Sequence, residues 1–210
     1  KLKLQEERHS GVPERIEAEP SAELWYKPLD RFLLPQASSF YSVIQPRIYS
    51  DQSQVVLLDL YSALLNDHLT EVVYPASFAG MSFKIYPHMR GLTLRIDGFS
   101  DKQGLLLEAI VQGFKEAQFT PAQFERIRYQ LLTRWQNVEK NAPYQRAVDI
   151  VDVLLLEHGL QVEEKIELLE KVSFADIERF AAQFTEGAYV RSMNSGNLSR
   201  DQAIAMQKIF

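Results

Sequence analysis

The 210-residue sequence contains no cysteine, and this absence excludes several kinds of functional site. Without thiols the chain cannot form a disulfide framework, a thiolate zinc site, an iron–sulfur cluster or a cysteine nucleophile. Glycine and proline are scarce, at nine residues each, while 46% of the residues are hydrophobic, which excludes a disordered or collagen-like chain. A chain of this length can bury about 70% of its unfolded surface, so we expect a substantial core.

A basic excess is also lacking. The sequence has 23 lysines and arginines against 28 aspartates and glutamates, which gives a formal net charge of -5. A protein that binds duplex nucleic acid usually carries a basic excess, so we expect no nucleic-acid partner. No apolar run reaches the roughly 18 residues that a membrane-spanning helix needs, and we expect no membrane span.

The first 22 residues are polar and contain two prolines, a composition typical of a connector. They begin with Lys1–Ser10, which has neither an initiator methionine nor the apolar segment of a signal peptide. We therefore interpret residues 1–22 as a connector from a preceding domain and residues 23–210 as a single domain. Together they would be a fragment of a longer chain.

Hydrophobic periodicity predicts the elements of residues 23–210. Alternating or aromatic-rich runs predict strands at 24–27, 39–49, 81–86, 92–99 and 188–195. Helical spacing of apolar residues predicts helices at 51–74, 101–118, 120–140, 143–159, 162–171 and 173–184, and a last one from Ser199. This order predicts an α+β fold, with a mainly antiparallel sheet and helices packed on one face.

The imidazole side chains available for a metal site are those of His9, His68, His88 and His158. An inverted zincin site needs two histidines at i and i+4 of one helix, a glutamate beside the second, and a third ligand elsewhere. Two segments, Leu64–His68 and Leu154–His158, end like this motif but have leucine in place of the first histidine. One imidazole cannot hold Zn²⁺, so we expect no metal site and interpret both histidines as polar side chains on partly buried helices. We expect His88 to be exposed at a turn.

Other catalytic patterns are also missing. The turn at Gly196–Asn197 is not a nucleophile elbow, and Gly98–Gly104 lacks the spacing of a phosphate-binding loop. Four basic residues of one predicted helix could line a positive wall, although a solvated face is the commoner arrangement; they are Arg126, Arg128, Arg134 and Lys140. We therefore assign no catalytic, metal-binding or substrate-binding residue.

Eight short segments nevertheless follow one another in a distinctive order. They are Glu23–Lys27, Asp30–Pro35, Asn66–Leu69, Ala79–Ser82, Gly91–Gly98, Phe99–Gln103, Phe124–Glu125 and Gly196–Asn197. This distributed pattern resembles the third, non-catalytic domain of bacterial members of the pitrilysin and insulin-degrading enzyme family, which are zinc metallopeptidases of the inverzincin type. The resemblance covers roughly residues 23–210.

The resemblance implies four homologous α+β units in two halves, the first of which carries His-x-x-Glu-His and a downstream glutamate. When this chain is overlaid on that unit, Leu64 takes the place of the first histidine and His68 that of the second. Asp67 falls near the glutamate and Asn137 near the third ligand. Two of three ligands would be missing, so the resemblance implies an inactive unit, with zinc in another domain of the parent chain.

The function that the resemblance implies is architectural. This domain would form part of the wall of a chamber that encloses peptides, in the periplasm or cytoplasm of a bacterium, and would be inactive alone. Its partners would be the other domains of the parent chain and the enclosed peptides. Two alternatives stay open: a non-catalytic assembly module of the same fold, and an unrecognised hydrolase that uses Asp67 and His68.

Overall fold

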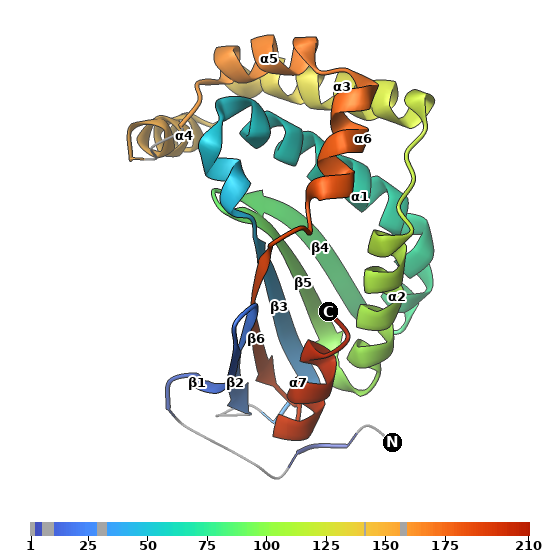
Figure 1. Ribbon diagram of the computed structural model, residues 1–210. Coiled ribbons are helices and arrows are strands. Elements are labelled where there is room, and N and C mark those ends of the chain that lie inside the picture. The colour runs from blue at the N-terminus through green and yellow to red at the C-terminus, as the bar shows by residue number, and fades with distance from the viewer. Residues whose placement is uncertain (1–2, 6–10, 29–32, 141, 156–158) are drawn as a thin grey trace.

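A six-stranded sheet with the strand order β1-β2-β6-β3-β5-β4 forms the centre of the molecule (Figure 1). The computed structural model describes residues 3–5, 11–28, 33–140, 142–155 and 159–210. The strands are β1 (Glu14–Glu19), β2 (Ala22–Pro28), β3 (Gln36–Ile44), β4 (Met81–His88), β5 (Gly91–Phe99) and β6 (Tyr189–Gly196). Strands β2 and β6 pair in parallel, and the remaining neighbours pair antiparallel.

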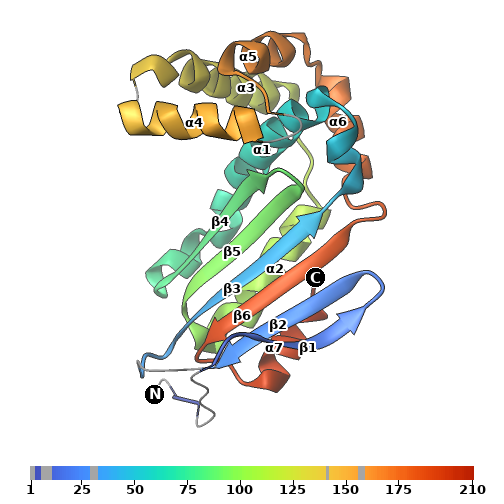
Figure 2. The same ribbon diagram turned by 90° about the vertical axis from the view of Figure 1, so that its left-hand side faces the viewer.

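The helices lie on one side of this sheet and beyond one of its ends. They are α1 (Gln52–Phe78), α2 (Gln103–Lys115), α3 (Pro121–Gln136), α4 (Pro143–Leu155), α5 (Val162–Lys171), α6 (Phe174–Gln183) and α7 (Arg200–Gln207). Helices α1, α2 and α7 cover one face, α3 to α6 gather past the end of the sheet, and the other face is bare (Figure 2). The predicted α+β fold with a mainly antiparallel sheet and helices on one face is confirmed. None of the helices in the described ranges has the length and apolar character that a bilayer-spanning segment needs.

Strand alternation explains why one face binds helices. Along β3 the residues Ala37, Ser39, Tyr41 and Val43 are buried, while the residues between them are half-buried on the bare side. The central helix α1 packs Leu58, Leu65 and Leu69 into the same core. Burial of each such side chain contributes roughly 1.5–3 kcal/mol, so the covered face holds the fold together.

The N-terminal region differs from the prediction of a polar connector. Residues Glu14–Glu19 form β1, an edge strand that pairs with β2. Pairing uses backbone groups, and an edge strand needs little apolar surface, so its polar composition concealed it. Ile16 alone of its residues packs on the small cluster of Leu24, Tyr26 and Ala203. The division of the chain into residues 1–22 and 23–210 remains a prediction.

Two further elements end at residues other than those predicted, and local sequence explains both differences. The predicted strand 39–49 ends at Ile44, because Pro46 starts a short 3₁₀ helix, Pro46–Ser50, which the Gln45 side chain caps. Helix α1 continues past its predicted end at residue 74 and through Pro75 to Phe78. A proline near a helix end removes one backbone hydrogen bond, and the chain reverses only at Gly80, whose φ is 71°.

Candidate functional site

The middle of α1 holds the positions at which the sequence resembles a zinc-binding helix. Residues 64 and 68 are one turn apart and lie on the same side of the helix. Leu64 is 1% exposed and belongs to the hydrophobic core. An apolar side chain embedded in this way offers no lone pair to a metal, so the first ligand position is closed by packing.

Asp67 is bound to an arginine of another helix. Helix α3 begins with a capping box of Thr120 and Gln123, as its Thr-Pro start predicts. This helix presents Arg126, whose Nη1 and Nη2 donate to the two carboxylate oxygens of Asp67 over 3.0 and 2.7 Å. The hydrogen bonds and charge of Asp67 raise the pKa of Arg126. Both carboxylate oxygens are therefore engaged in joining α1 to α3.

His68 does not form a pair with Asp67. The half-buried imidazole meets the ring of Phe119 edge-on, with 6.4 Å between the ring centroids. Successive helix residues point about 100° apart, so adjacent side chains do not face each other. Within the described ranges no hydrogen bond joins Asp67 and His68. The geometry thus lends no support to a hydrolytic pair at these positions.

Asn137, which the resemblance places near the third ligand, forms hydrogen bonds at the end of α3. Its Nδ2 donates to the carbonyl of Thr133 over 2.7 Å, and its Oδ1 accepts from Lys140 Nζ over 2.6 Å. Together with Leu64 and Asp67, this side chain does not fit a zinc ion.

Across the described residues, no group of three or more His, Asp or Glu side chains is arranged to hold a metal. His9 and the Leu154–His158 motif with its terminal His158 lie wholly or partly outside the described residues. The absence of zinc from the chain as a whole remains a prediction.

Asn66 binds the edge strand β4, a role that no sequence motif indicates. Its Nδ2 donates to the carbonyl of Ile85 over 2.7 Å and to that of Ser62 over 2.8 Å, and its Oδ1 accepts from the Ile85 N–H over 3.2 Å. Edge strands expose unpaired backbone groups, and this amide pairs both groups of Ile85. An asparagine inside a long helix, where its propensity is poor, was the available signal.

His88 is half-buried on the bare face, and the expectation of an exposed turn residue was wrong. The histidine is the last residue of β4, and its side chain reaches across β5 to Ser42 of β3. Its Nδ1 accepts from the Arg90 N–H over 3.1 Å, so its Nε2 donates to Ser42 Oγ, 2.9 Å away. Burial lowers the pKa of this imidazole.

The bare face of the sheet, which is turned toward the viewer in Figure 2, receives aromatic and charged side chains from all six strands. The register places on this face Arg15, Glu23, Trp25, Lys27, Phe40, Lys84, Tyr86, Arg95, Asp97, Tyr189, Arg191 and Met193. Five of these are basic and two are acidic, whereas the whole chain is acidic. The guanidinium of Arg95 lies 5.2 Å from the centroid of Phe40 and its Nε lies 2.7 Å from Asp97 Oδ2.

Glu23 is the most buried charged residue of this face. Desolvation opposes its ionisation, but hydrogen bonds to Arg191 and to Trp25, with the charges of Arg191 and Arg15, lower its pKa. The carboxylate thereby ties β2 to both neighbouring strands.

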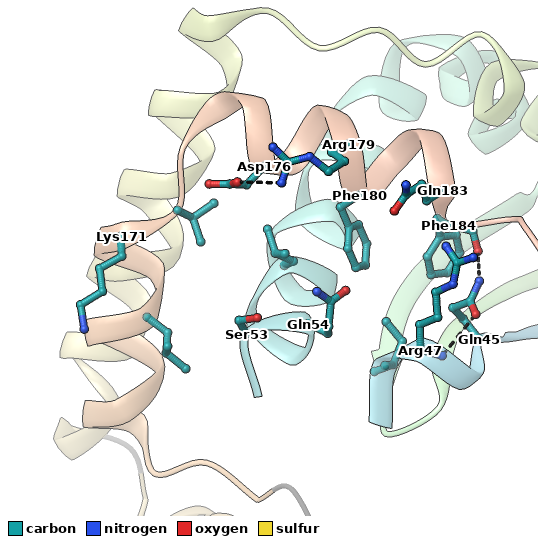
Figure 3. Close-up of a pocket in the computed structure, with 14 residues that line it drawn as sticks. Gln45, Arg47, Ser53, Gln54, Lys171, Asp176, Arg179, Phe180, Gln183 and Phe184 are labelled. Atoms are coloured by element: carbon teal, nitrogen blue, oxygen red, sulfur yellow. Dashed lines mark hydrogen bonds and ion pairs between the residues drawn. The ribbon is translucent and has the colours of Figure 1, made fainter. Parts of the chain in front are cut away.

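An open pocket of about 310 Å³ lies between the start of α1, the end of α5 and α6 (Figure 3). Phe180 and Phe184 line it, and three of its charged side chains are engaged in ion pairs. Asp176 is paired with Arg179 and Arg47 with Glu186, each over 3.5 Å. The buried Gln45 donates to the carbonyls of Phe184 and Glu186. The polar contacts around this pocket thus connect structural elements. Its lining residues form no catalytic arrangement.

Comparisons with known proteins identify the family to which the chain is similar. Residues 1–168 match the family described as the middle or third domain of peptidase M16. The chain is 26% identical to human insulin-degrading enzyme over 204 residues, which is 97% of this chain and 20% of that protein. It is 29% identical to nardilysin of Pongo abelii over 198 residues, or 93% of this chain and 17% of that protein.

A solved structure shows the same fold. The crystal structure of pitrilysin has a TM-score of 0.86 and 20% identity, over 99% of this chain and 22% of the pitrilysin chain. The chain thus spans about a fifth of the length of the curated relatives that it matches.

Proposed function

Because the chain belongs to the family of the middle or third domain of peptidase M16, we propose that it is a wall domain of a zinc metalloendopeptidase. In this proposal the domain forms part of a chamber that encloses peptide substrates. Hydrolysis takes place at a zinc site in another domain of the parent protein. The domain itself contributes enclosure and contact.

One observation carries this proposal: the six-stranded sheet is covered by helices on one face only (Figures 1 and 2). The bare face is broad, and it combines aromatic side chains such as Trp25 and Phe40 with basic side chains such as Arg95. Aromatic surface suits the apolar side chains of a peptide, and basic groups suit its carboxylates. Such a surface is better suited to contact with an unfolded peptide than to exposure to water alone.

The positions at which α1 resembles a zinc-binding helix support a structural role for this helix. Leu64 is packed in the core, Asp67 is bound to Arg126, and Asn66 is bound to β4. These three side chains therefore contribute to the packing and joining of structural elements. A rigid wall excludes bulky folded substrates and displaces water from the bound peptide, so size and fit would govern specificity.

Photo-cross-linking in the full-length parent protein tests the wall. A photoreactive amino acid is placed at Lys84, on the bare face, and in a matched variant at Glu108, an exposed position of α2 on the helical side. Ultraviolet irradiation with a labelled peptide substrate should label the Lys84 variant and not the Glu108 variant. Equal labelling at both positions, or none at Lys84, would refute the wall, and the latter would favour an assembly module.

A further inference from the structure

Helix α4 exposes an apolar stripe that the rest of the described chain leaves uncovered. The stripe consists of Tyr144, Val148, Val151, Leu154 and Leu155, with Ile150 at its border, and all six side chains are exposed. Leu154 is 77% exposed and Leu155 76%. Of the α4 side chains that the structure describes, Val153 is half-buried and the others are exposed.

Its spacing shows that the stripe is one continuous surface. Steps of three and four residues along α4 bring its members to one side of the helix, as in helices that dock on an apolar partner. A helix of 13 residues is marginally stable without tertiary contacts. An uncovered stripe of this kind therefore indicates a missing partner.

The location of α4 leaves room for that partner. The helix lies past the end of the sheet and projects toward the side on which the sheet is bare (Figures 1 and 2). Helices α3 and α5, its neighbours, pack through Phe124, Ile127, Leu131 and Leu169 into the main core. These side chains of α3 and α5 are therefore occupied in the main core and do not cover the stripe.

We propose that the apolar stripe of α4 is the docking surface for another domain of the parent chain, which covers it with an uncharged apolar helix or groove. This inference rests on the multidomain parent of the proposed function and not on the chamber wall. About four fifths of the length of the matched relatives lies outside this chain, which supplies the missing surface. The helix falls within the residues that match the family, so it belongs to the domain itself.

The chemistry of the stripe defines its partner. The six members include no charged side chain, and a charge on the partner would be buried unpaired, at a high desolvation cost. Residues spaced at i, i+3, i+4 and i+7 are the anchors of a helix that binds in an apolar groove.

A second copy of the chain is the rival occupant. A tethered domain acts at an effective concentration on the order of millimolar, so it competes successfully against a separate molecule at micromolar concentration.

Cysteine labelling in the full-length parent tests the covering of α4. This chain has no cysteine of its own, so Leu154→Cys introduces one thiol into the domain with a mild change of volume. Leu105→Cys, on α2, is the matched control because Leu105 is 59% exposed. Maleimide labelling of each site, identified by peptide mapping, is compared with labelling of the same variant unfolded in denaturant.

Native Leu154→Cys should react at least tenfold more slowly than unfolded Leu154→Cys. Native Leu105→Cys should react at a rate close to that of unfolded Leu105→Cys. Equal native and unfolded rates at position 154 would overturn the proposal. The occupant is identified with a cross-linker attached to Leu154→Cys in a mixture of isotopically light and heavy chains. Cross-links within one chain are expected, whereas light-to-heavy cross-links would show a second copy and would also overturn it. Photo-cross-linking from Lys84 can fail without affecting this outcome, so the two proposals are separable.

Discussion

Arg126 donates two hydrogen bonds to Asp67, and this single ion pair fastens α3 to α1 one residue before His68. Each carboxylate oxygen of Asp67 accepts one of these hydrogen bonds, so both oxygens are engaged by the guanidinium. The pair contributes to the contact between these two helices.

The first prediction concerns this pair. In the full-length parent, Asp67→Asn should leave kcat for peptide hydrolysis unchanged and lower thermal stability slightly, because a half-exposed ion pair contributes little. Arg126→Gln should have the same effect, and the double variant should lose little more than either. A fall in kcat of about 10²–10⁴-fold for Asp67→Asn would instead identify a general base.

Asn66 should matter more for stability than its polar character suggests. Asn66→Ala leaves the N–H and carbonyl of the buried Ile85 without their partner. Loss of partners for buried polar groups costs about 1–3 kcal/mol, which urea unfolding of the domain can measure. Glu71→Ala, an exposed change on the same helix, should stay within about 0.5 kcal/mol of the unmodified protein. If both variants are equally stable, the amide does not hold the edge strand.

Stability should also depend on pH through Asp59. Burial raises the pKa of this carboxyl, and Lys165, 3.4 Å away, opposes the shift only in part. A raised pKa in the folded state means that the folded chain binds the proton more tightly than the unfolded chain. The contribution of Asp59 to stability is therefore present below its unfolded pKa of about 3.9 and is lost as pH rises through the folded value.

Urea unfolding at a series of pH values checks this sign. Asp59→Asn cannot ionise, so its stability relative to the unmodified chain should improve as the pH rises from about 4 toward neutrality. A relative stability that worsens over the same range would mean that the ion pair with Lys165 outweighs the cost of burial.

The isolated chain should contain no stoichiometric zinc and show no zinc-dependent peptidase activity. Leu64 and Asn137 provide no ligand set around His68, and Asp67 is occupied by Arg126. Metal analysis after dialysis, with and without added zinc, measures the first property, and a fluorogenic peptide measures the second. One tightly bound zinc per chain would contradict the structural role assigned to α1.

Periodicity predicted the parts of the fold in which burial repeats regularly. The wide apolar stripe of α1 and the alternation in Leu92, Leu94 and Ile96 both correspond to elements packed on the core. Strand β1 was missed because an edge strand is specified by the backbone of its neighbour, not by apolar side chains. Asn66 was missed because its bonds to Ile85 cross 19 positions of sequence.

The candidate site, like the fold, could be predicted only where residue type or local spacing decides the outcome. That position 64 offers no lone pair to a metal follows from residue type alone, because it is a leucine. That Arg126 engages Asp67 depends on how α3 crosses α1, which no local pattern encodes. Similarly, the sequence shows which side of α4 is apolar, but only the structure shows that it is uncovered.

The place of β6 in the sheet has a consequence for how this domain is made. Strand β6 lies between β2 and β3, and its partner residues in β2 are more than 160 positions earlier. During synthesis the β1–β2 hairpin thus has no neighbour in the sheet until the residues of β6 leave the ribosome. Contacts over such long separations form slowly. A shortened chain that stops at residue 168, where the family match ends, would lack the strand that joins the two parts of the sheet.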